Sequence, residues 1–429
     1  METERTLIIG AGPAGLTAAI ASARRGRETI LLEKNSRPGR KLYISGKGRC
    51  NLTNNCSVQT VIDNTPTNGR FLYSALTAFP PQALMEMMEQ GGLPLKTERG
   101  NRVFPVSDKA GDVVDTFVRL AKEAGAQFRQ GEAEALLLSD GRVQGVRLKN
   151  GQELLCSRLI IATGGVSYPL TGSTGDGYRF AAQAGHTIVP PRPSLVPLLT
   201  EEHSGYDADG LLLKNIAIRL KDGKKKKTIY EDFGELELRR WGLSGAVVRS
   251  ASAHIRQMEA GRYRLELDLK PALTEEVLDS RLQRELAVSP GQPCRVIFKT
   301  LVPQALVEDI AKRAGAVSEV PCAQVKREQR RELSRLLKSM DFHITGFRPL
   351  EEAIVTSGGV SVKEISPSTM ESKLVRGLFF AGEVIDYDCY TGGFNIQSAA
   401  STGCLAAGQR DAAPISGGFS PGPPSGAFT

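Results

Sequence analysis

The sequence predicts an α/β protein built on a discontinuous Rossmann-type domain, and three observations lead to this fold class. A glycine-rich motif near the N-terminus lies between an apolar strand and a helix of small residues. Strand-like and helix-like segments alternate up to about residue 190, and the same style returns after residue 378. Between them, residues 195–250 show short alternating strands and residues 272–340 are charged and helical, which indicates an inserted antiparallel β module and a helical subdomain.

The glycine-rich motif has the features of a dinucleotide site. It follows an expected strand at residues 6–9 and opens a helix, the context that makes a G-x-G-x-x-G pattern informative. Gly10 permits the tight turn, Gly12 lets the backbone approach a pyrophosphate, and Gly15 lets the helix lie close to the strand. Pro13 and Ala14 start the helix, whose free N–H groups and dipole would face the phosphates.

An acidic residue closes the next strand. Glu33 would bind the ribose hydroxyls of the adenosine half, and Lys34 beside it is expected to belong to the same site. A carboxylate at this position favours FAD or NAD over NADP, because it would repel the 2′-phosphate of NADP. The alternative is a glycine-rich turn without a ligand, which leaves the acidic residue at the strand end unexplained.

Three further glycine-rich stretches each follow a strand or open a helix. The first carries basic residues at positions 40, 41, 47 and 49, near the expected pyrophosphate and flavin. The third leads into a helix near residue 395, whose N-terminus would face the N1–C2=O edge of the flavin, where negative charge collects on reduction. Each stretch alone fits an ordinary turn, but together with the first motif they favour a flavin site. The cofactor-binding residues expected in them are Arg40, Lys41, Gly48, Arg49, Cys50, Asn51, Ala162, Thr163, Gly164, Gly165, Gly382, Glu383, Gly392, Gly393, Phe394, Asn395, Ile396 and Gln397.

The composition is ordinary for a globular protein. The 429 residues suit two or three domains, with 41% hydrophobic and 24% charged residues. No apolar run reaches the roughly 18 residues that span a bilayer, and no signal peptide precedes the first strand, so we expect a cytoplasmic protein with no membrane partner. Seven scattered cysteines without C-x-x-C and four histidines without ligand spacing predict no metal site.

The charge balance is basic. A net charge of +8 permits an anionic partner such as nucleic acid. Part of the excess is Lys224–Lys227, the expected tip of a hairpin between strands at 216–220 and 228–230. This tip is either a solvated loop or a finger that contacts phosphates. A second basic segment is the expected helix at residues 326–338.

Composition shifts predict the order of the domains. Four prolines within Pro190–Pro197 suit a crossing between domains. The expected parts are a first FAD-binding part at 1–191, a β module at 192–271 plus 341–355, a helical subdomain at 272–340, a second FAD-binding part at 356–412 and a disordered tail at 413–429. Inside them we expect a hairpin of residues 142–148 with 152–155, and separate short strands at 195–200, 227–233 and 234–240.

Four motifs carry a resemblance to a known family. GAGPAG, GRKLYISGKGRCNLTN, IIATGG and GLFFAGEVIDYDCYTGGFNIQSA resemble the FAD-dependent BaiN/RdsA-like flavoproteins, also called aminoacetone-oxidase-like, across nearly all of residues 4–410. The resemblance implies an FAD domain interrupted by a β-barrel-like module and a helical module. It also implies a flavin reductase for an activated C=C bond, since members are linked to bile-acid enone reduction and to dihydrouridine in ribosomal RNA. Lys47 and the pair Cys389-Tyr390 depart from the usual pattern, so the substrate preference is open.

The implied chemistry needs an oxyanion-stabilising group and a proton donor. Arg49 is a candidate for binding the enolate or the substrate, and Cys50 for donating the proton, since a thiol near cations titrates more easily. Tyr390 or Cys389 are the alternatives for the proton donor, and Cys50 is otherwise a buried packing residue. Because the chain has a single dinucleotide fingerprint, an NAD(P)H donor would bind transiently.

Three functions remain open from the sequence. The favoured one is reduction of uridine in ribosomal RNA, because the basic segments suit a phosphate-rich partner. The second is a reductase or oxidase for small molecules such as steroid enones, unsaturated acids or amines. The third is a flavin-containing RNA-binding or assembly protein without turnover.

Overall fold

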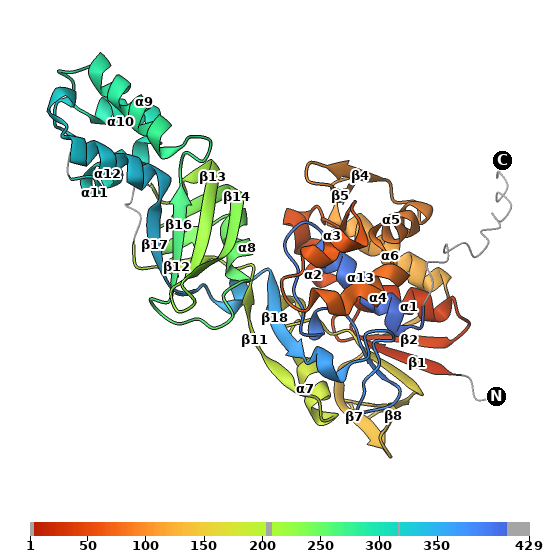
Figure 1. Cartoon of the computed structure of the whole chain (residues 1–429). Helices are drawn as coiled ribbons and strands as arrows, with labels where there is room; N and C mark the ends of the chain where they lie inside the picture. The colour runs from red at the N-terminus through yellow and green to blue at the C-terminus, as the bar shows by residue number, and fades with distance from the viewer. Residues whose placement is uncertain (1–3, 203–207, 316–317, 410–429) are drawn as a thin grey trace, which may run out of the picture. The chain divides into compact units, whose positions relative to one another are not determined.

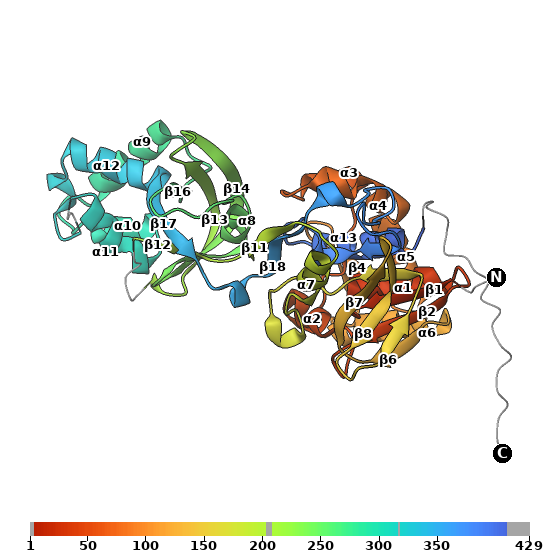
Figure 2. The same cartoon turned by 90° about the horizontal axis from the view of Figure 1, so that it is seen from below.

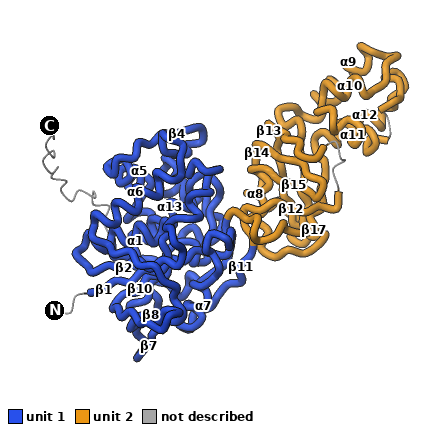
Figure 3. The backbone as a smooth tube through the Cα atoms, turned by 180° about the vertical axis from the view of Figure 1, so that it is seen from behind, with its two compact units in different colours: residues 1–192, 355–429 blue, residues 193–354 orange. Residues whose placement is uncertain are grey.

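The computed structural model describes residues 4–202, 208–315 and 318–409. The chain forms two compact units (Figure 3). Unit 1 contains residues 1–192 and 355–429, and unit 2 contains residues 193–354. The first unit is therefore discontinuous in sequence, because the second is inserted into it.

Unit 1 is built on a five-stranded parallel sheet in the order β19-β10-β1-β2-β6. Its strands are β1 (Arg5–Ile9), β2 (Glu28–Glu33), β6 (Gln127–Gln130), β10 (Arg158–Ile161) and β19 (Leu378–Phe380). The three central strands are apolar almost throughout, as expected for a sheet buried on both faces. Because these strands are parallel, their carboxyl ends meet at one edge, where the predicted site residues follow them.

Helices surround this sheet and its neighbouring loops (Figure 1). They are α1 (Pro13–Ala23), α2 (Arg40–Ile44), α3 (Val58–Asp63), α4 (Tyr73–Ala78), α5 (Pro81–Gln90), α6 (Ala110–Glu123), α7 (Asp176–Gln183) and α13 (Phe394–Ala406). Helices α1 and α13 are rich in small residues and almost fully buried, and they pack against each other (Figure 2). At their crossing, a Cβ on Gly403 would lie 2.1 Å from the carbonyl oxygen of Ala14.

Three small sheets complete unit 1. They are β3 (Thr53–Asn54), β5 (Arg102–Pro105) and β4 (Leu95–Glu98); β7 (Ala133–Ser139), β8 (Arg142–Leu148) and β9 (Glu153–Leu155); and β11 (Ile188–Ser194) with β18 (Val355–Val360). The hairpin expected from residues 142–148 and 152–155 thus gains a third strand. Strand β7 was missed in the sequence analysis, because only Gly131 and Glu132 separate it from β6.

Unit 2 contains a closed antiparallel barrel in the order β12-β15-β14-β13-β16-β17. Its strands are β12 (Leu198–Thr200), β13 (Leu212–Asp222), β14 (Lys227–Arg239), β15 (Gly242–Ser244), β16 (Tyr263–Asp268) and β17 (Met340–Phe347). The helices of this unit are α8 (Ala246–Ser252), α9 (Glu275–Val288), α10 (Arg295–Leu301), α11 (Val307–Arg313) and α12 (Arg327–Lys338). Leu265 in the barrel and Leu278 and Leu337 in the helices are completely buried in one common core.

The fold class predicted from the sequence is confirmed, with corrections inside the barrel. Residues 227–239 form one strand, β14, because Gly234 pairs with Ile216 in the ladder and makes no turn, and residue 240 of the second expected strand lies outside it. The strand expected at 195–200 is shorter and begins at Leu198. The tail at 413–429 lies outside the described residues, and the exact module boundaries stay a prediction. Among the described residues, no helix combines the length and the apolar character needed to cross a bilayer.

The contact between α1 and α13 yields a stability prediction. Gly403→Ala should lower the free energy of unfolding by about 1–3 kcal/mol, because the new methyl meets backbone atoms of Ala14 that cannot turn away. Gly111→Ala in α6 is the matched control, since its nearest neighbour, Tyr43, lies at an ordinary 3.4 Å. Alanine favours a helix over glycine, so the control should be neutral or slightly stabilising. Urea unfolding of both variants measures this, and equal stability of the two would contradict the packing argument.

Candidate functional site

The turn between β1 and α1 leaves backbone donors free at its centre. Gly10 has a positive φ of 101°, and a Cβ on Gly15 would lie 1.8 Å from the carbonyl oxygen of Gly10, so neither position admits a side chain. Among the described residues no side chain caps α1, and Pro13 is its first residue, so the N–H groups of the first turn have no partner inside the helix. A Cβ on Gly12 would meet no protein atom within 4 Å. This open space before a helix N-terminus fits a phosphate group.

Glu33 is fixed beside this turn at the end of β2. Its Oε2 accepts a hydrogen bond from the N–H of Ala11 at 2.8 Å, and its Oε1 accepts from the N–H and Nδ2 of Asn35 at 2.8 and 2.7 Å. A carboxylate has about four lone-pair sites, so acceptor capacity remains for ribose hydroxyls. The side chain is therefore held in the orientation that the dinucleotide motif requires.

The two lysines predicted to bind the cofactor are engaged in ion pairs. Lys34 Nζ contacts Asp176 Oδ2 at 2.6 Å and so connects the end of β2 to the first residue of α7. Lys41 Nζ contacts Glu383 Oε2 and Ser167 Oγ, both at 2.7 Å. The structure thus brings Lys41 and Glu383 together, but as partners of each other, and neither charge is left unbalanced.

A left-handed turn follows α2. Gly46, Lys47 and Gly48 all have positive φ, at 56°, 58° and 82°, and Cys50 follows at 57°. Left-handed residues normally occur singly, and each non-glycine residue in this region is disfavoured by roughly 1 kcal/mol or more. The turn is held at both ends by the bonds from Arg49 N to Gly46 O and from Cys50 N to Ser45 O. It exposes the Lys47 side chain on a rigid backbone.

The start of α13 rests on the strand that follows this turn. A Cβ on Gly393 would lie 2.3 Å from the backbone of Thr53, so only glycine permits the contact. With its amide oriented so that both atoms find partners, Asn51 donates to Thr53 O at 3.1 Å and accepts from Gly393 N at 3.1 Å. Asn54 Nδ2 donates to Gly392 O at 3.1 Å. No side chain in the described part of the chain caps α13, so its first N–H groups remain available to an electron-rich ligand edge.

The side chain of Gln397 is bonded within the protein. It is completely buried, donates to Phe79 O and Ser401 Oγ at 3.0 Å each, and accepts from Thr53 Oγ1 at 2.6 Å. These bonds fix α13 against β3 and the end of α4, and the assignment of Gln397 to the cofactor stays a prediction.

Arg49 is clamped between two carboxylates. Its guanidinium donates to Asp108 Oδ1 at 2.8 and 2.6 Å and to both oxygens of Glu98, and it lies 4.2 Å above the ring of Phe104. The hydrogen bonds to Glu98 and then to Asp108 raise the pKa of Arg49 further above its usual range. With Lys96 also bound to Asp108, the cluster has two positive and two negative charges. This balance argues against Arg49 as the group that stabilises an enolate.

The two thiols among the catalytic candidates are completely buried. Burial raises the pKa of Cys50 to about 11 and that of Cys389 to about 12. The Cys389 thiol contacts Thr65 Oγ1 at 3.2 Å and Ser398 Oγ at 3.3 Å. The expectation that cations make Cys50 titrate more easily is wrong. The charge of the neighbouring Arg49 is balanced by two carboxylates, and desolvation is the largest effect on the pKa of Cys50. The structure supports a packing role for both thiols.

Tyr390 is the remaining candidate for a proton donor. Its side chain is partly exposed, unlike the two thiols. Its backbone is fixed, because its N–H donates to Asn64 O at 2.9 Å and its carbonyl accepts from Asn395 Nδ2 at 3.1 Å. Tyr390 thus stands directly before the free N-terminus of α13, and its catalytic role stays a prediction.

The sequence analysis missed residues that hold the loop after β10 and Glu383 in place. Thr356 Oγ1 accepts from the N–H groups of Val166 and Ser167 at 2.9 and 3.1 Å, while Thr356 N donates to Glu383 at 2.8 Å. A Cβ on Gly165 would lie 2.4 Å from Thr356 Oγ1, which explains the glycine at this position. The Gly-Gly pair at 358–359 was the available indication for this segment. Among the described residues, no group of three or more possible metal ligands occurs.

These features fit FAD. The carboxyl ends of β1, β2, β10 and β19 lead into Gly10, Glu33, Ala162 and Gly382 at one edge of the sheet, with free N–H groups at the starts of α1 and α13. The first helix suits a diphosphate, Glu33 a ribose, and α13 the electron-rich edge of a flavin ring. The fold and the site define a flavoprotein with a Rossmann-type FAD-binding domain.

Comparison with known proteins gives the family. The chain belongs to the HI0933-like family, whose description is the HI0933-like protein Rossmann domain and which matches residues 4–409. It is 30% identical to the 3-dehydro-bile acid delta(4,6)-reductase of Clostridium scindens, over 93% of this chain and 97% of the relative. It is 29% identical to the ribosomal RNA dihydrouridine synthase of Escherichia coli, over 94% of this chain and 96% of the relative. The corresponding synthase of Haemophilus influenzae is 30% identical, over 92% and 96%. The resemblance seen in the motifs is confirmed, and the chain is an FAD-dependent oxidoreductase.

The open space at Gly12 yields a prediction for cofactor binding. Gly12→Ala should leave the protein folded, because its φ of −80° suits alanine and its Cβ would meet no protein atom. The methyl would instead occupy the approach of the pyrophosphate and weaken FAD binding about tenfold to a hundredfold, the equivalent of a steric cost of ~1–3 kcal/mol. Titration of the apoprotein with FAD by flavin fluorescence measures the affinity. Gly291→Ala is the control, because a Cβ at Gly291 would also meet no atom within 4 Å. Equal FAD affinity of both variants would contradict the position of the pyrophosphate at Gly12.

The buried thiols yield a prediction for pH dependence. At pH 8, a thiol reagent should label the partly exposed Cys56 first, whereas Cys50 and Cys389 should react only after unfolding. Because burial raises the pKa of both thiols, their stabilising contribution is complete below the ordinary thiol pKa of about 8.5 and is lost as the pH rises toward 11 and 12. Rapid labelling of Cys50 in the folded protein at pH 8 would restore it as a catalytic candidate.

Proposed function

We propose that this chain reduces an activated C=C bond with electrons from NAD(P)H, and that its substrate is uridine in ribosomal RNA. The observation that carries the proposal is the full-length similarity to relatives named for two such reactions. A delta(4,6)-reductase of a 3-dehydro-bile acid and a dihydrouridine synthase both saturate a double bond conjugated to a carbonyl. The common chemistry is therefore better supported than either substrate.

The chain's own residues have three tasks in this reaction. FAD, which Gly10, Gly12 and Glu33 would hold, would supply the hydride for the electron-poor carbon, with NAD(P)H as the source of its electrons. The protein must orient the double bond, stabilise negative charge on the conjugated oxygen and protonate the neighbouring carbon. We assign the proton to Tyr390, because it is partly exposed at the start of α13 while Cys50 and Cys389 are inside the core. Because Glu98 and Asp108 balance the charge of Arg49, we assign the stabilisation of the negative oxygen to backbone N–H groups.

The basic segments favour RNA over a small molecule. Residues 221–227 contain five lysines against one aspartate, and residues 326–338 contain six basic against two acidic residues. In the first segment, Lys225, Lys226 and Lys227 are exposed and have no ion pair among the described residues. In the second, Arg330, Arg335 and Lys338 are paired with acidic residues, whereas the exposed Lys326, Arg327 and Arg331 have no ion pair among the described residues. Both segments therefore support a phosphate-rich partner, and the first concentrates its unpaired cations in three consecutive residues.

Hydrogen bonds fix the turn within residues 221–227, which we call the lysine turn. Asp222 is almost completely buried, accepts from the N–H groups of Lys224 and Lys225, and is bound by Arg262 at 3.0 and 2.8 Å. The hydrogen bond from Arg262 holds the pKa of Asp222 down at about 2, so the turn keeps its anchor at any physiological pH. A fixed cationic turn loses less entropy on binding a phosphate than a solvated loop would.

The substrate is tested with ribosomal RNA. Nucleosides from a strain that lacks this gene should lose a dihydrouridine detected by mass spectrometry, and the gene supplied in trans should restore it. Unchanged dihydrouridine in both strains would contradict the RNA substrate. Reduction of a 3-dehydro-bile acid by the purified holoenzyme with NADPH would then favour the small-molecule function.

The proton donor is tested by Tyr390→Phe. Removal of a general acid should lower the rate of C=C reduction by about 10²- to 10⁴-fold, while NAD(P)H oxidation by oxygen and FAD content stay unchanged. Tyr73→Phe is the matched control, because Tyr73 is an exposed tyrosine elsewhere in unit 1. A Tyr390→Phe enzyme that reduces the double bond at the original rate would assign the proton to another group.

A further inference from the structure

One face of the small sheet β3-β5-β4 in unit 1 is turned toward the start of α13. Asn54 on β3 lies directly opposite Arg102 on β5, and residues that lie opposite each other in antiparallel strands project from the same face of the sheet. The Asn54 side chain donates to Gly392 O at 3.1 Å, next to the first turn of α13. The Arg102 side chain therefore leaves the sheet on the face that carries this contact.

The left-handed turn of residues 46–48 packs against the same face. A Cβ on Gly46 would lie 3.5 Å from Phe104 Cε1 and 2.8 Å from Asn51 N. Phe104 follows Arg102 by two residues on β5, so its ring projects from the face that carries Arg102. The Arg102 guanidinium lies 5.8 Å from the centre of that ring. Lys47 and Arg102 thus belong to two segments that meet at Phe104.

The tip of the β4–β5 hairpin is bonded at the same place. The Asn54 amide donates to Gly100 O at 3.0 Å, so one side chain joins the hairpin tip to the start of α13. Arg99 at the tip is exposed, and its carbonyl oxygen accepts from Arg102 Nε at 3.0 Å. We call the exposed side chains of Lys47, Arg99 and Arg102 the cationic rim.

The carboxylates on this face of the sheet are bound to other cations. Glu98 lies directly opposite Arg102 in the ladder, but both of its oxygens accept from Arg49. Asp108 accepts from Arg49 and from Lys96. Two carboxylates therefore balance two cations, whereas the three cations of the rim have no ion pair among the described residues.

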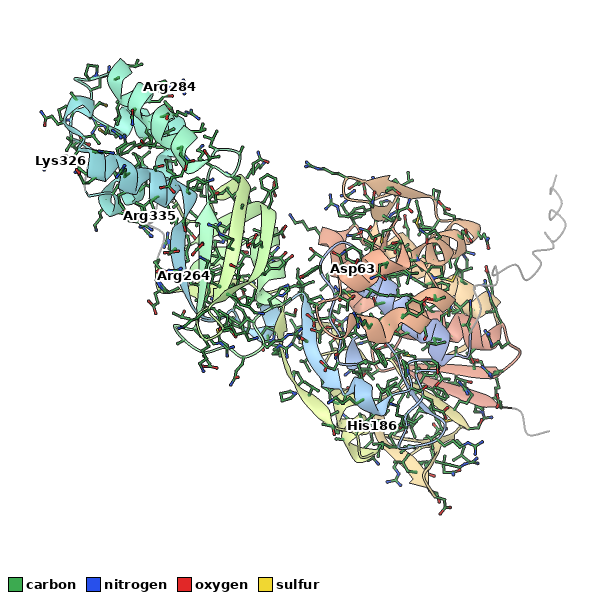
Figure 4. All side chains as sticks on the ribbon, viewed as in Figure 1. Asp63, His186, Arg264, Arg284, Lys326 and Arg335 are labelled. Atoms are coloured by element: carbon green, nitrogen blue, oxygen red, sulfur yellow. The ribbon has the colours of Figure 1, made fainter. Side chains whose placement is uncertain are left out.

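Other carboxylates in the neighbourhood do not neutralise the rim either. Asp386 and Asp388 are 9% and 1% exposed and accept hydrogen bonds from neighbouring side chains. Asp63, labelled in Figure 4, is exposed at the end of α3 and accepts from a glutamine one turn earlier. Glu86 and Glu89 are exposed on α5, which packs against β3 and β4. Within the described parts of the chain, none of these five forms an ion pair with the rim.

Lys47 occupies a backbone position that glycine would fill more easily. It has φ 58° and ψ 41° between two glycines that also have positive φ. In this left-handed region the Cβ of lysine crowds the carbonyl oxygen, a clash that glycine avoids. Residues held in such conformations collect at functional sites. The strain presents a cation beside the start of α13, and no carboxylate in the described residues binds it.

We propose that the cationic rim binds the phosphates next to the reacting base of a single-stranded RNA segment. The base would lie at the start of α13 beside Tyr390, while Lys47 and Arg102 would each contact a phosphodiester through charge-assisted hydrogen bonds. A base must leave its stack to reach an enzyme's reacting group, so the bound strand is single. The inference rests on the proposed function and assigns the part of unit 1 that holds its substrate.

The experiment measures binding of a short fluorescent oligouridylate to the FAD-loaded protein at several salt concentrations. Lys47→Gln with Arg102→Gln should weaken binding and lower the steepness of the salt dependence by about 1.4, roughly 0.7 for each phosphate contact on a single strand.

Arg142→Gln with Arg376→Gln is the matched control. Both arginines are exposed, bridge each other and have no ion pair among the described residues. Arg376 precedes β19, so it lies at the amino edge of the parallel sheet, whereas the candidate site follows the carboxyl ends of the strands. The control should keep the original affinity and salt dependence.

Lys47→Gly separates ligand binding from folding. Glycine relieves the left-handed conformation, so this variant should unfold at the same urea concentration as the original protein or at a higher one. It should nevertheless bind the oligouridylate more weakly, with a steepness lower by about 0.7. A merely structural role of Lys47 would not weaken binding in a protein of undiminished stability.

Three results would overturn the inference: equal losses in the rim and control variants, an unchanged salt dependence in the rim variants, and a Lys47→Gly protein that binds as tightly as the original. A carboxylate is the other source of anionic oxygens. If Lys47→Gln with Arg102→Gln raises the KM of a 3-dehydro-bile acid but not that of its neutral methyl ester, the rim binds a carboxylate and the RNA assignment is overturned.

Failure of the proposed function is read separately, from dihydrouridine in the complemented strain. If dihydrouridine is restored while the rim variants bind normally, the cationic rim is wrong and the RNA substrate stands. If binding depends on the rim but no dihydrouridine forms, the phosphate site stands and uridine reduction is wrong.

Discussion

Unit 1 depends on the close approach of α1 to both β1 and α13. A Cβ on Gly15 would collide with the carbonyl oxygen of Gly10, and a Cβ on Gly403 with that of Ala14. A Cβ on Gly382 would lie 2.9 Å from the Cβ of Ala14. The first contact sets where the phosphate-binding N–H groups stand, and the other two set where α13 and the turn after β19 stand. The two ends of the flavin site are therefore connected through Ala14. A displaced α1 would misplace both the diphosphate and the ring at once.

Ion pairs determine how much positive charge the side chains of the site can offer to a ligand. The cations that the sequence places near the ring are mostly balanced by carboxylates, as in Lys41 with Glu383 and Arg49 with Glu98 and Asp108. A balanced surrounding offers little to a developing oxyanion from side chains. The uncapped first turn of α13 adds a positive potential that costs no reorganisation during the reaction.

The sequence predicted the residues of local motifs, but it did not predict properties that depend on side chains from distant parts of the chain, such as burial and ion pairing. Gly10, Gly12, Gly15 and Glu33 act through backbone geometry within one strand–turn–helix unit, so the sequence alone defines them. The state of Cys50 depends on burial, and that of Arg49 on carboxylates supplied by β4 and the loop before α6, which no local pattern reveals. The single strand β14 was missed for a related reason, since Gly234 suggests a turn until its partner Ile216 is known.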